Sequence, residues 1–150
     1  MSIFPTNILL ATDGSWEAEL AATTAADLAN ATNSELHVVH VGEWTPTVLA
    51  QTEVEPAQLE REAQQLLDEE VRRVEEDGGT VKEAHLRLGR TDEEIVDLAQ
   101  SLDVGLIVIG SRGRGRIRRA LMGSVSDSVV RHAPCPVTIV RQRTDPDTGW

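Results

Sequence analysis

Short apolar runs alternate with longer amphipathic stretches along almost the whole chain. Residues 3–11 end in an unbroken apolar run, as is typical of a strand that is covered on both faces. Residues 16–31 then carry alanine and leucine at the spacing of a helix. The alternation continues to the end of the chain and predicts further strands at residues 35–41, 80–88, 106–109 and 137–141, and further helices at 55–77, 91–102 and 124–133.

This order of elements predicts an α/β fold in one domain. Strands that alternate with helices form a parallel sheet, with right-handed crossovers that place helices on both faces. Residues 80–88 alternate polar and apolar side chains, so we expect that strand at an edge of the sheet. Residues 42–51 are predicted to be irregular. Residues 142–150 are polar, and we expect them to form a flexible tail after a domain of residues 1–141.

Two helix starts follow from capping patterns. Thr91 is followed three residues later by Glu94, which is the pattern of a capping box with Thr91 as the cap. Ser124 is followed three residues later by Asp127, and we expect Ser124 to cap the last helix.

Composition excludes several classes of function. The chain has 150 residues and a net charge of -11, with 25 acidic residues against 14 basic ones, of which Lys82 is the only lysine. Such a charge repels phosphate backbones, so we do not expect nucleic-acid binding. No signal segment and no apolar run of about 18 residues is present, so we expect a cytoplasmic protein without membrane contact. One cysteine allows no disulfide within the chain.

Residues 110–124, with the sequence GSRGRGRIRRALMGS, combine glycines, arginines and a predicted helix start. Glycines allow the chain to turn or a ligand to approach the backbone. Five arginines occur in this segment and no acid does. Free N–H groups and the helix dipole at Ser124 attract anions. The segment therefore predicts a phosphate-binding loop, although the glycines could serve only as turns and the arginines could only offset an acidic body.

Polar residues follow two of the predicted strands where each strand ends. Thr12 and Asp13 follow the first strand, and Gly110 follows the fourth. Ligands of open parallel sheets bind beyond the carboxyl ends of the strands, where the strand order reverses. If these two strands are neighbours, Asp13 faces the glycine-arginine loop. Asp13 then either caps the first helix or holds a ribose hydroxyl or a metal on a nucleotide, and both roles are compatible.

The glycine spacing reads G-x2-G-x9-G-S from Gly110 through Ser124. A Walker-type loop is excluded because no lysine stands beside the last glycine. A dinucleotide fingerprint starting at Gly113 is also excluded, because it requires glycine where this chain has Arg118.

This motif, the segment ATDGS after the first strand and the segment HAPCPVTIVR near the end resemble the universal stress protein family over about residues 3–141. The resemblance implies a Rossmann-like sheet with strand order 3-2-1-4-5 and membership of the ATP-binding subgroup. It also implies ATP as the ligand, with Mg²⁺ as a possible companion, and a homodimer formed through residues 137–141.

The resemblance assigns roles to individual residues. Asp13 would contact the ribose or adenine, and Val41 would contact adenine through its backbone. Gly110 and Gly113 would line the ribose and phosphates, and the last helix start would hold phosphate oxygens. The full predicted set is Thr12, Asp13, Val41, Gly110, Arg112, Gly113, Gly123, Ser124 and Val125.

The resulting hypothesis is an ATP-binding stress protein with a regulatory or protective role. One alternative is a slow ATPase or self-phosphorylating protein, and another is a nucleotide-independent protein-interaction module. No catalytic residue and no protein-bound metal is predicted, and His37, His40 and His85 are interpreted as core or surface histidines.

The acidic surplus leads to a testable hypothesis of salt adaptation. An acid-rich surface with few lysines suits a salt-rich cytosol, where screening weakens the repulsion between like charges. Drift towards arginine codons would produce the same bias without adaptation. If the chain is salt-adapted, its Tm should rise as KCl increases from low to molar concentration in a thermal melting series. A Tm that stays flat across the series would reject this hypothesis.

Overall fold

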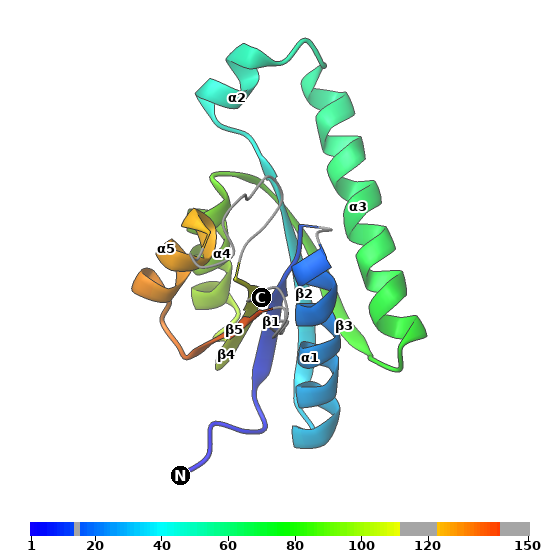
Figure 1. The fold of residues 1–150 in the computed structure, drawn as a ribbon, viewed down its shortest axis with the longest axis vertical. Helices are drawn as coiled ribbons and strands as arrows, with labels where there is room; N and C mark the ends of the chain where they lie inside the picture. Colours follow the sequence, from blue (N-terminus) through cyan, green and yellow to red (C-terminus); the bar gives the residue numbers. More distant parts are fainter. Residues whose placement is uncertain (14–15, 112–122, 142–150) are drawn as a thin grey trace, which may run out of the picture.

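The computed structural model describes residues 1–13, 16–111 and 123–141. Within them, five strands form one parallel sheet in the order β3-β2-β1-β4-β5 (Figure 1). This confirms the predicted α/β class and strand order. The strands are β1 Asn7–Ala11, β2 Glu35–Glu43, β3 Val81–Gly89, β4 Leu106–Gly110 and β5 Val137–Val140.

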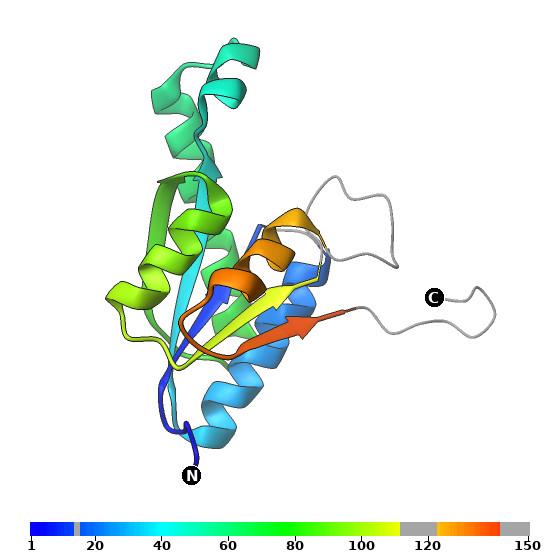
Figure 2. The ribbon, with the colours of Figure 1, turned by 90° about the vertical axis from the view of Figure 1, so that its left-hand side faces the viewer.

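Helices cover both faces of this sheet. Helices α1 and α3 pack on one face, and α4 and α5 pack on the other, which faces the viewer in Figure 2. A short helix, α2, precedes α3 at the top of Figure 1. The helices are α1 Trp16–Thr32, α2 Pro46–Gln51, α3 Pro56–Glu76, α4 Thr91–Ser101 and α5 Ser124–His132.

The central strand β1 contributes to both hydrophobic cores. Ile8 and Leu10 pack in the cluster beneath α1 and α3, and Leu9 packs in the cluster beneath α4 and α5. All three side chains are completely buried. Alternate residues of a strand point to opposite faces, so a strand with helices on both sides needs apolar residues at every position. This explains the unbroken apolar run that the sequence shows here.

Several boundaries differ from the prediction. The first strand begins at Asn7 rather than at residue 3, and the second continues to Glu43. Part of the segment predicted as irregular forms α2, whose start is capped by the Thr45 hydroxyl accepting a hydrogen bond from the Val48 N–H at 3.3 Å. The predicted edge position of β3 is confirmed. The predicted tail at residues 142–150 lies outside the described residues.

Both predicted caps are wrong by one residue. Arg90 precedes α4 in an extended conformation, and its carbonyl accepts the first helical hydrogen bond from Glu94 at 3.0 Å. Gly123 precedes α5 in an extended conformation, and its carbonyl accepts a hydrogen bond from the Asp127 N–H at 3.0 Å. Thr91 and Ser124 are therefore the first helical residues, and neither helix has a side-chain cap.

In the three described ranges, we find no helix that is both long enough and apolar enough to cross a membrane.

Candidate functional site

A cavity of about 720 Å³ opens at the carboxyl ends of the central strands. It is bordered by the ends of β1, β2 and β4, by the first turns of α4 and α5, and by one side of α3. Seven of the nine predicted site residues line it: Thr12, Asp13, Val41, Gly110, Gly123, Ser124 and Val125. Arg112 and Gly113 lie outside the described residues.

The pairing of β1 with β4 brings the residues that follow β1 close to the end of β4. Ala11 pairs with Ile109 in parallel register, so the next residues of both strands leave the sheet at the same edge. The Thr12 N–H also donates to the Val39 carbonyl at 3.0 Å, which holds the tip of β1 against β2. Asp13 and Gly110 consequently border one cavity, as expected if these strands are neighbours.

The start of α5 is tied to the end of β4 through Ser111. The Ser111 carbonyl accepts a hydrogen bond from the Gly123 N–H at 2.7 Å and another from the Ser126 hydroxyl at 2.5 Å. Ser124 follows as the first helical residue, and its side chain is exposed. The first N–H groups of a helix have no acceptor within the helix, and the dipole makes this end attractive to anions. This end of the cavity can therefore bind an anionic group.

Gly110 has a packing reason to be glycine. A Cβ built at this position would lie 3.2 Å from the Glu17 Cβ and 3.3 Å from the Glu17 carbonyl oxygen. A side chain at this position would therefore require the first turn of α1 to shift by a few tenths of an ångström. Ser111, the next residue, donates from its hydroxyl to the buried Glu17 carboxylate at 2.5 Å. Close packing against α1 thus favours glycine at position 110, independently of any ligand.

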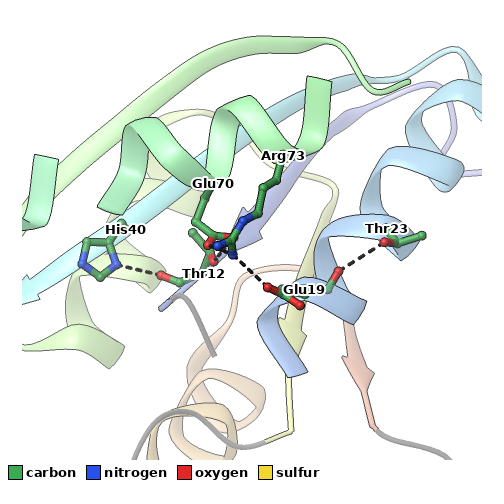
Figure 3. Close-up of polar contacts among 6 residues, drawn as sticks. All are labelled: Thr12, Glu19, Thr23, His40, Glu70 and Arg73. Atoms are coloured by element: carbon green, nitrogen blue, oxygen red, sulfur yellow. Dashed lines mark hydrogen bonds and ion pairs between the residues drawn. The ribbon is translucent and has the colours of Figure 1, made fainter. Parts of the chain in front are cut away.

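A buried acid on α3 supports the residue that precedes Asp13 (Figure 3). The Thr12 hydroxyl donates to Glu70 at 3.3 Å, and Arg73 donates to the other Glu70 oxygen at 2.9 Å and to Glu19 at 2.8 Å. Glu70 is only 2% exposed. Burial raises the pKa of Glu70, while Arg73 and the Thr12 hydroxyl oppose that rise. The network fixes the tip of β1 to α3.

His40 also holds this tip and lines the cavity. Its Nδ1 lies 2.8 Å from the Thr12 carbonyl oxygen (Figure 3). Because a carbonyl can only accept, Nδ1 carries the proton in this hydrogen bond. His40 is 9% exposed, which agrees with the interpretation of a core histidine that has a hydrogen-bond partner.

Much of the cavity lining is apolar. Val41 and Ile95 belong to it, together with three side chains of α3, namely Leu59, Ala63 and Leu66. Its charged members among the described residues are all acidic: Asp13, Glu43 and Glu62. The cavity therefore offers an apolar surface, carboxylates and the N-termini of α4 and α5.

A buried carboxylate joins the two helices whose starts border the cavity. Asp92, in the first turn of α4, accepts a hydrogen bond from the Ser128 hydroxyl of α5 at 2.6 Å and another from Arg90 at 2.9 Å. Burial by itself would raise the pKa of Asp92, but the hydrogen bonds from Ser128 and Arg90 outweigh it and hold the pKa below its ordinary value.

Comparison with known proteins identifies the family. A model of the universal stress protein family matches residues 5–141. The chain belongs to the universal stress protein family. It is 35% identical over 146 residues to a putative universal stress protein of Staphylococcus haemolyticus, an alignment that covers 94% of this chain and 87% of the relative.

Solved structures are similar over almost the whole length. The hypothetical protein MJ0577, whose structure is described as an assignment of biochemical function, aligns with a TM-score of 0.79 and 27% identity, covering 95% of this chain and 99% of that one. The universal stress protein from Archaeoglobus fulgidus in complex with dAMP aligns with a TM-score of 0.69 and 26% identity, covering 93% and 100%. That relative binds an adenine nucleotide.

Sequence reasoning missed two supports of the site in this universal stress protein. Glu70 shares one face of α3 with the buried residues Ala63, Leu67 and Val74. The position of an acid within the apolar stripe of this helix could therefore have predicted a buried polar contact. The contact of His40 with Thr12 had no comparable signal, because it depends on the pairing of β1 with β2.

Replacing Asp92 with asparagine should weaken the connection between α4 and α5. Because the folded-state pKa is lowered, ionised Asp92 stabilises the fold above the ordinary aspartate pKa of 3.8, and this contribution is lost as the pH falls through the folded-state pKa. We expect Asp92→Asn to reduce the free energy of unfolding by about 1.5–3 kcal/mol at neutral pH, the range for hydrogen bonds to charged groups. Urea unfolding at several pH values measures this.

The difference between wild type and Asp92→Asn should shrink as the pH approaches and passes below 3.8. Asp97→Asn, which changes an exposed carboxylate on the same helix, serves as the control and should have little effect. A difference that is independent of pH would contradict the role of the ionised carboxylate.

Proposed function

We propose that this universal stress protein binds ATP in the cavity at the carboxyl ends of β1 and β4. The observation that carries the proposal is that Asp13 and the N-terminus of α5 border the same cavity. The chain order reverses between β1 and β4, and this is where open α/β sheets bind ligands. The volume of about 720 Å³ falls within the range of about 300–1,000 Å³ for small-molecule sites.

The proposed orientation follows from the chemistry of the cavity walls. The adenine ring packs against the apolar wall near Val41 and Ile95, and the ribose lies near the Asp13 carboxylate. The phosphates point towards the backbone N–H groups of Ser124 and Val125 at the start of α5, next to Gly123. The dAMP complex of the Archaeoglobus fulgidus relative supports an adenine nucleotide as the class of ligand.

The phosphate end needs more positive charge than the described lining provides. ATP carries roughly four negative charges, and an anion at a helix N-terminus gains only about 0.3–2 kcal/mol. The charged side chains among the described lining residues are acidic. We propose that Arg112 and neighbouring arginines supply cations, that Gly113 admits the phosphates, and that Mg²⁺ accompanies the nucleotide.

Occupancy of the site is proposed to regulate a stress response in the cytoplasm. A ligand that binds only the folded state stabilises it by mass action, by about 2.7 kcal/mol at 100 times its Kd. In this proposal the nucleotide stabilises one surface that a partner protein recognises.

ATP with Mg²⁺ should raise the Tm of the wild-type protein by about 5–10 °C at 100 times the Kd, given about 2–4 °C per kcal/mol for a chain of this size. Ser124→Glu should abolish this rise, because it places a negative charge at the phosphate end of α5. Ser124 is exposed, so the substitution removes no packing. Gly113→Val should also abolish the rise. Thermal melting with and without nucleotide measures each effect.

Ser124→Gln is the matched control, because glutamine has the size of glutamate without its charge. It should keep most of the ATP-induced rise. Tm values measured without nucleotide verify that each variant folds. An unchanged ATP shift in both Ser124→Glu and Gly113→Val would refute the assignment of the site.

The second part of the proposal is a homodimer formed through residues 137–141. Strand β5 lies at one edge of the sheet and pairs with β4 on one side. Pro136 and Val140 direct their carbonyls towards β4, so the backbone groups of Val137 and Ile139 point to the open edge. A second copy can extend the sheet or cover this strand.

Light scattering after size exclusion should give twice the chain mass of 16.4 kDa. Ile139→Pro removes a backbone donor from the open edge and should shift the protein towards monomer, since proline is tolerated at edge positions that face outwards. Circular dichroism controls for the fold. A wild-type mass of one chain at all concentrations would exclude the dimer.

A further inference from the structure

Three side chains that commonly bind transition metals converge near the start of the β2–β3 pair. His37 is on β2, and Glu83 and His85 are on β3. None of the three lines the cavity at the opposite ends of the strands. The cluster is therefore separate from the proposed nucleotide site.

A β-bulge places these residues on one face of the sheet. The register shifts between Leu36 and His37, so that His37 pairs with Glu83 and Val39 pairs with His85. Without the shift, His37 would pair with Lys82, and Glu83 and His85 would point to the face covered by α1 and α3. The bulge thus brings both β3 side chains to the face of His37, on the side of α4 and α5.

The distances between the ligand atoms match a small tetrahedral ion. His37 Nδ1 lies 3.2 Å from His85 Nε2, and a Glu83 carboxylate oxygen lies 3.2 Å from the same Nε2. All three ligand atoms lie within 4.8 Å of one another. Zinc bonds of about 2.0–2.2 Å in tetrahedral geometry imply ligand–ligand distances of about 3.3–3.5 Å. Two of the three distances are therefore almost those of a formed site.

Hydrogen bonds alone do not give all three ligand atoms a good partner. If His85 Nε2 carries a proton, it donates to Glu83 or to His37 but cannot serve both well. If His85 Nε2 accepts from His37 instead, its lone pair lies 3.2 Å from a carboxylate oxygen. One cation bonded to all three atoms would instead accept one lone pair from each of them.

The environment suits a metal ion. His37 is 6% exposed, and the side chain of His85 is 11% exposed, whereas that of Glu83 is 60% exposed and gives access from solvent. Burial lowers the pKa of both imidazoles, which favours the neutral form that binds metals. Imidazole ligands favour zinc and its neighbours over Mg²⁺ and Ca²⁺, which prefer oxygen.

We propose that His37, Glu83 and His85 bind one Zn²⁺ ion. Two histidines and one carboxylate supply three ligands and leave a fourth position for water or an exogenous ligand, as in zinc sites that keep an open position. The sequence analysis predicted no metal, because the three residues come together only through the register of β2 with β3.

Isothermal titration with ZnCl₂ tests this site in untagged protein that has been treated with chelator and freed of nucleotide. The wild type should bind one Zn²⁺ per chain. Glu83→Gln keeps the size of an exposed side chain and should weaken binding by at least about tenfold. His85→Gln should weaken it by more than about 100-fold, since even an outer-shell partner contributes about 10–100-fold.

Two control variants separate this site from general surface binding. His132→Gln removes an exposed imidazole on α5, and Glu60→Gln removes an exposed carboxylate on α3. Both should bind Zn²⁺ like the wild type. Co²⁺ should produce the visible absorption of a four-coordinate ion in the wild type and lose it in His85→Gln. No saturable Zn²⁺ binding in the wild type, or equal affinity in all four variants, would overturn the proposal.

Discussion

The parallel pairing of β1 with β4 is the constraint on which the site depends. Ala11 and Ile109 lie opposite each other, so the residues that follow both strands leave the sheet at one edge. The chain order reverses there, and ligands of open parallel sheets bind at such a reversal. Burial of β1 on both faces keeps this pair at the centre of the sheet. The order of the strands therefore determines where the cavity lies, and the side chains determine only its lining.

Buried polar contacts then hold the backbone around that cavity in place. The Ser111 carbonyl accepts from the start of α5, while the Ser111 hydroxyl donates to Glu17 at the start of α1. Glu70 holds Thr12 from the side of α3. Buried hydrogen bonds of this kind rigidify a structure because breaking one leaves a polar group without a partner. The backbone around the cavity is therefore already ordered before a ligand binds, which reduces the entropy lost on binding.

Charge is distributed unevenly between the body and the loop after β4. The body is strongly acidic, yet five arginines occur between residues 110 and 124. These arginines precede α5 in the sequence, whereas the charged side chains among the described residues that line the cavity are acidic. On the β2–β3 pair, a register shift rather than charge gathers His37, Glu83 and His85. Both proposed sites depend on where strands end or on how they pair, rather than on residues adjacent in sequence.

The sequence by itself determined the five strands, four of the helices, their order and the α/β class, because hydrophobic period is a local property of the chain, but it did not predict α2. Its resemblance to a family supplied the strand order, and seven of the nine predicted site residues line one cavity. Only the tertiary structure decided that Arg90 and Gly123, rather than Thr91 and Ser124, precede the helices, because a cap depends on the backbone conformation where the chain enters a helix. Tertiary structure also decided the contact of Glu70 with Thr12 and the register shift beside His37. Both join residues from distant parts of the chain. Such residues are brought together by packing and strand register rather than by local sequence pattern.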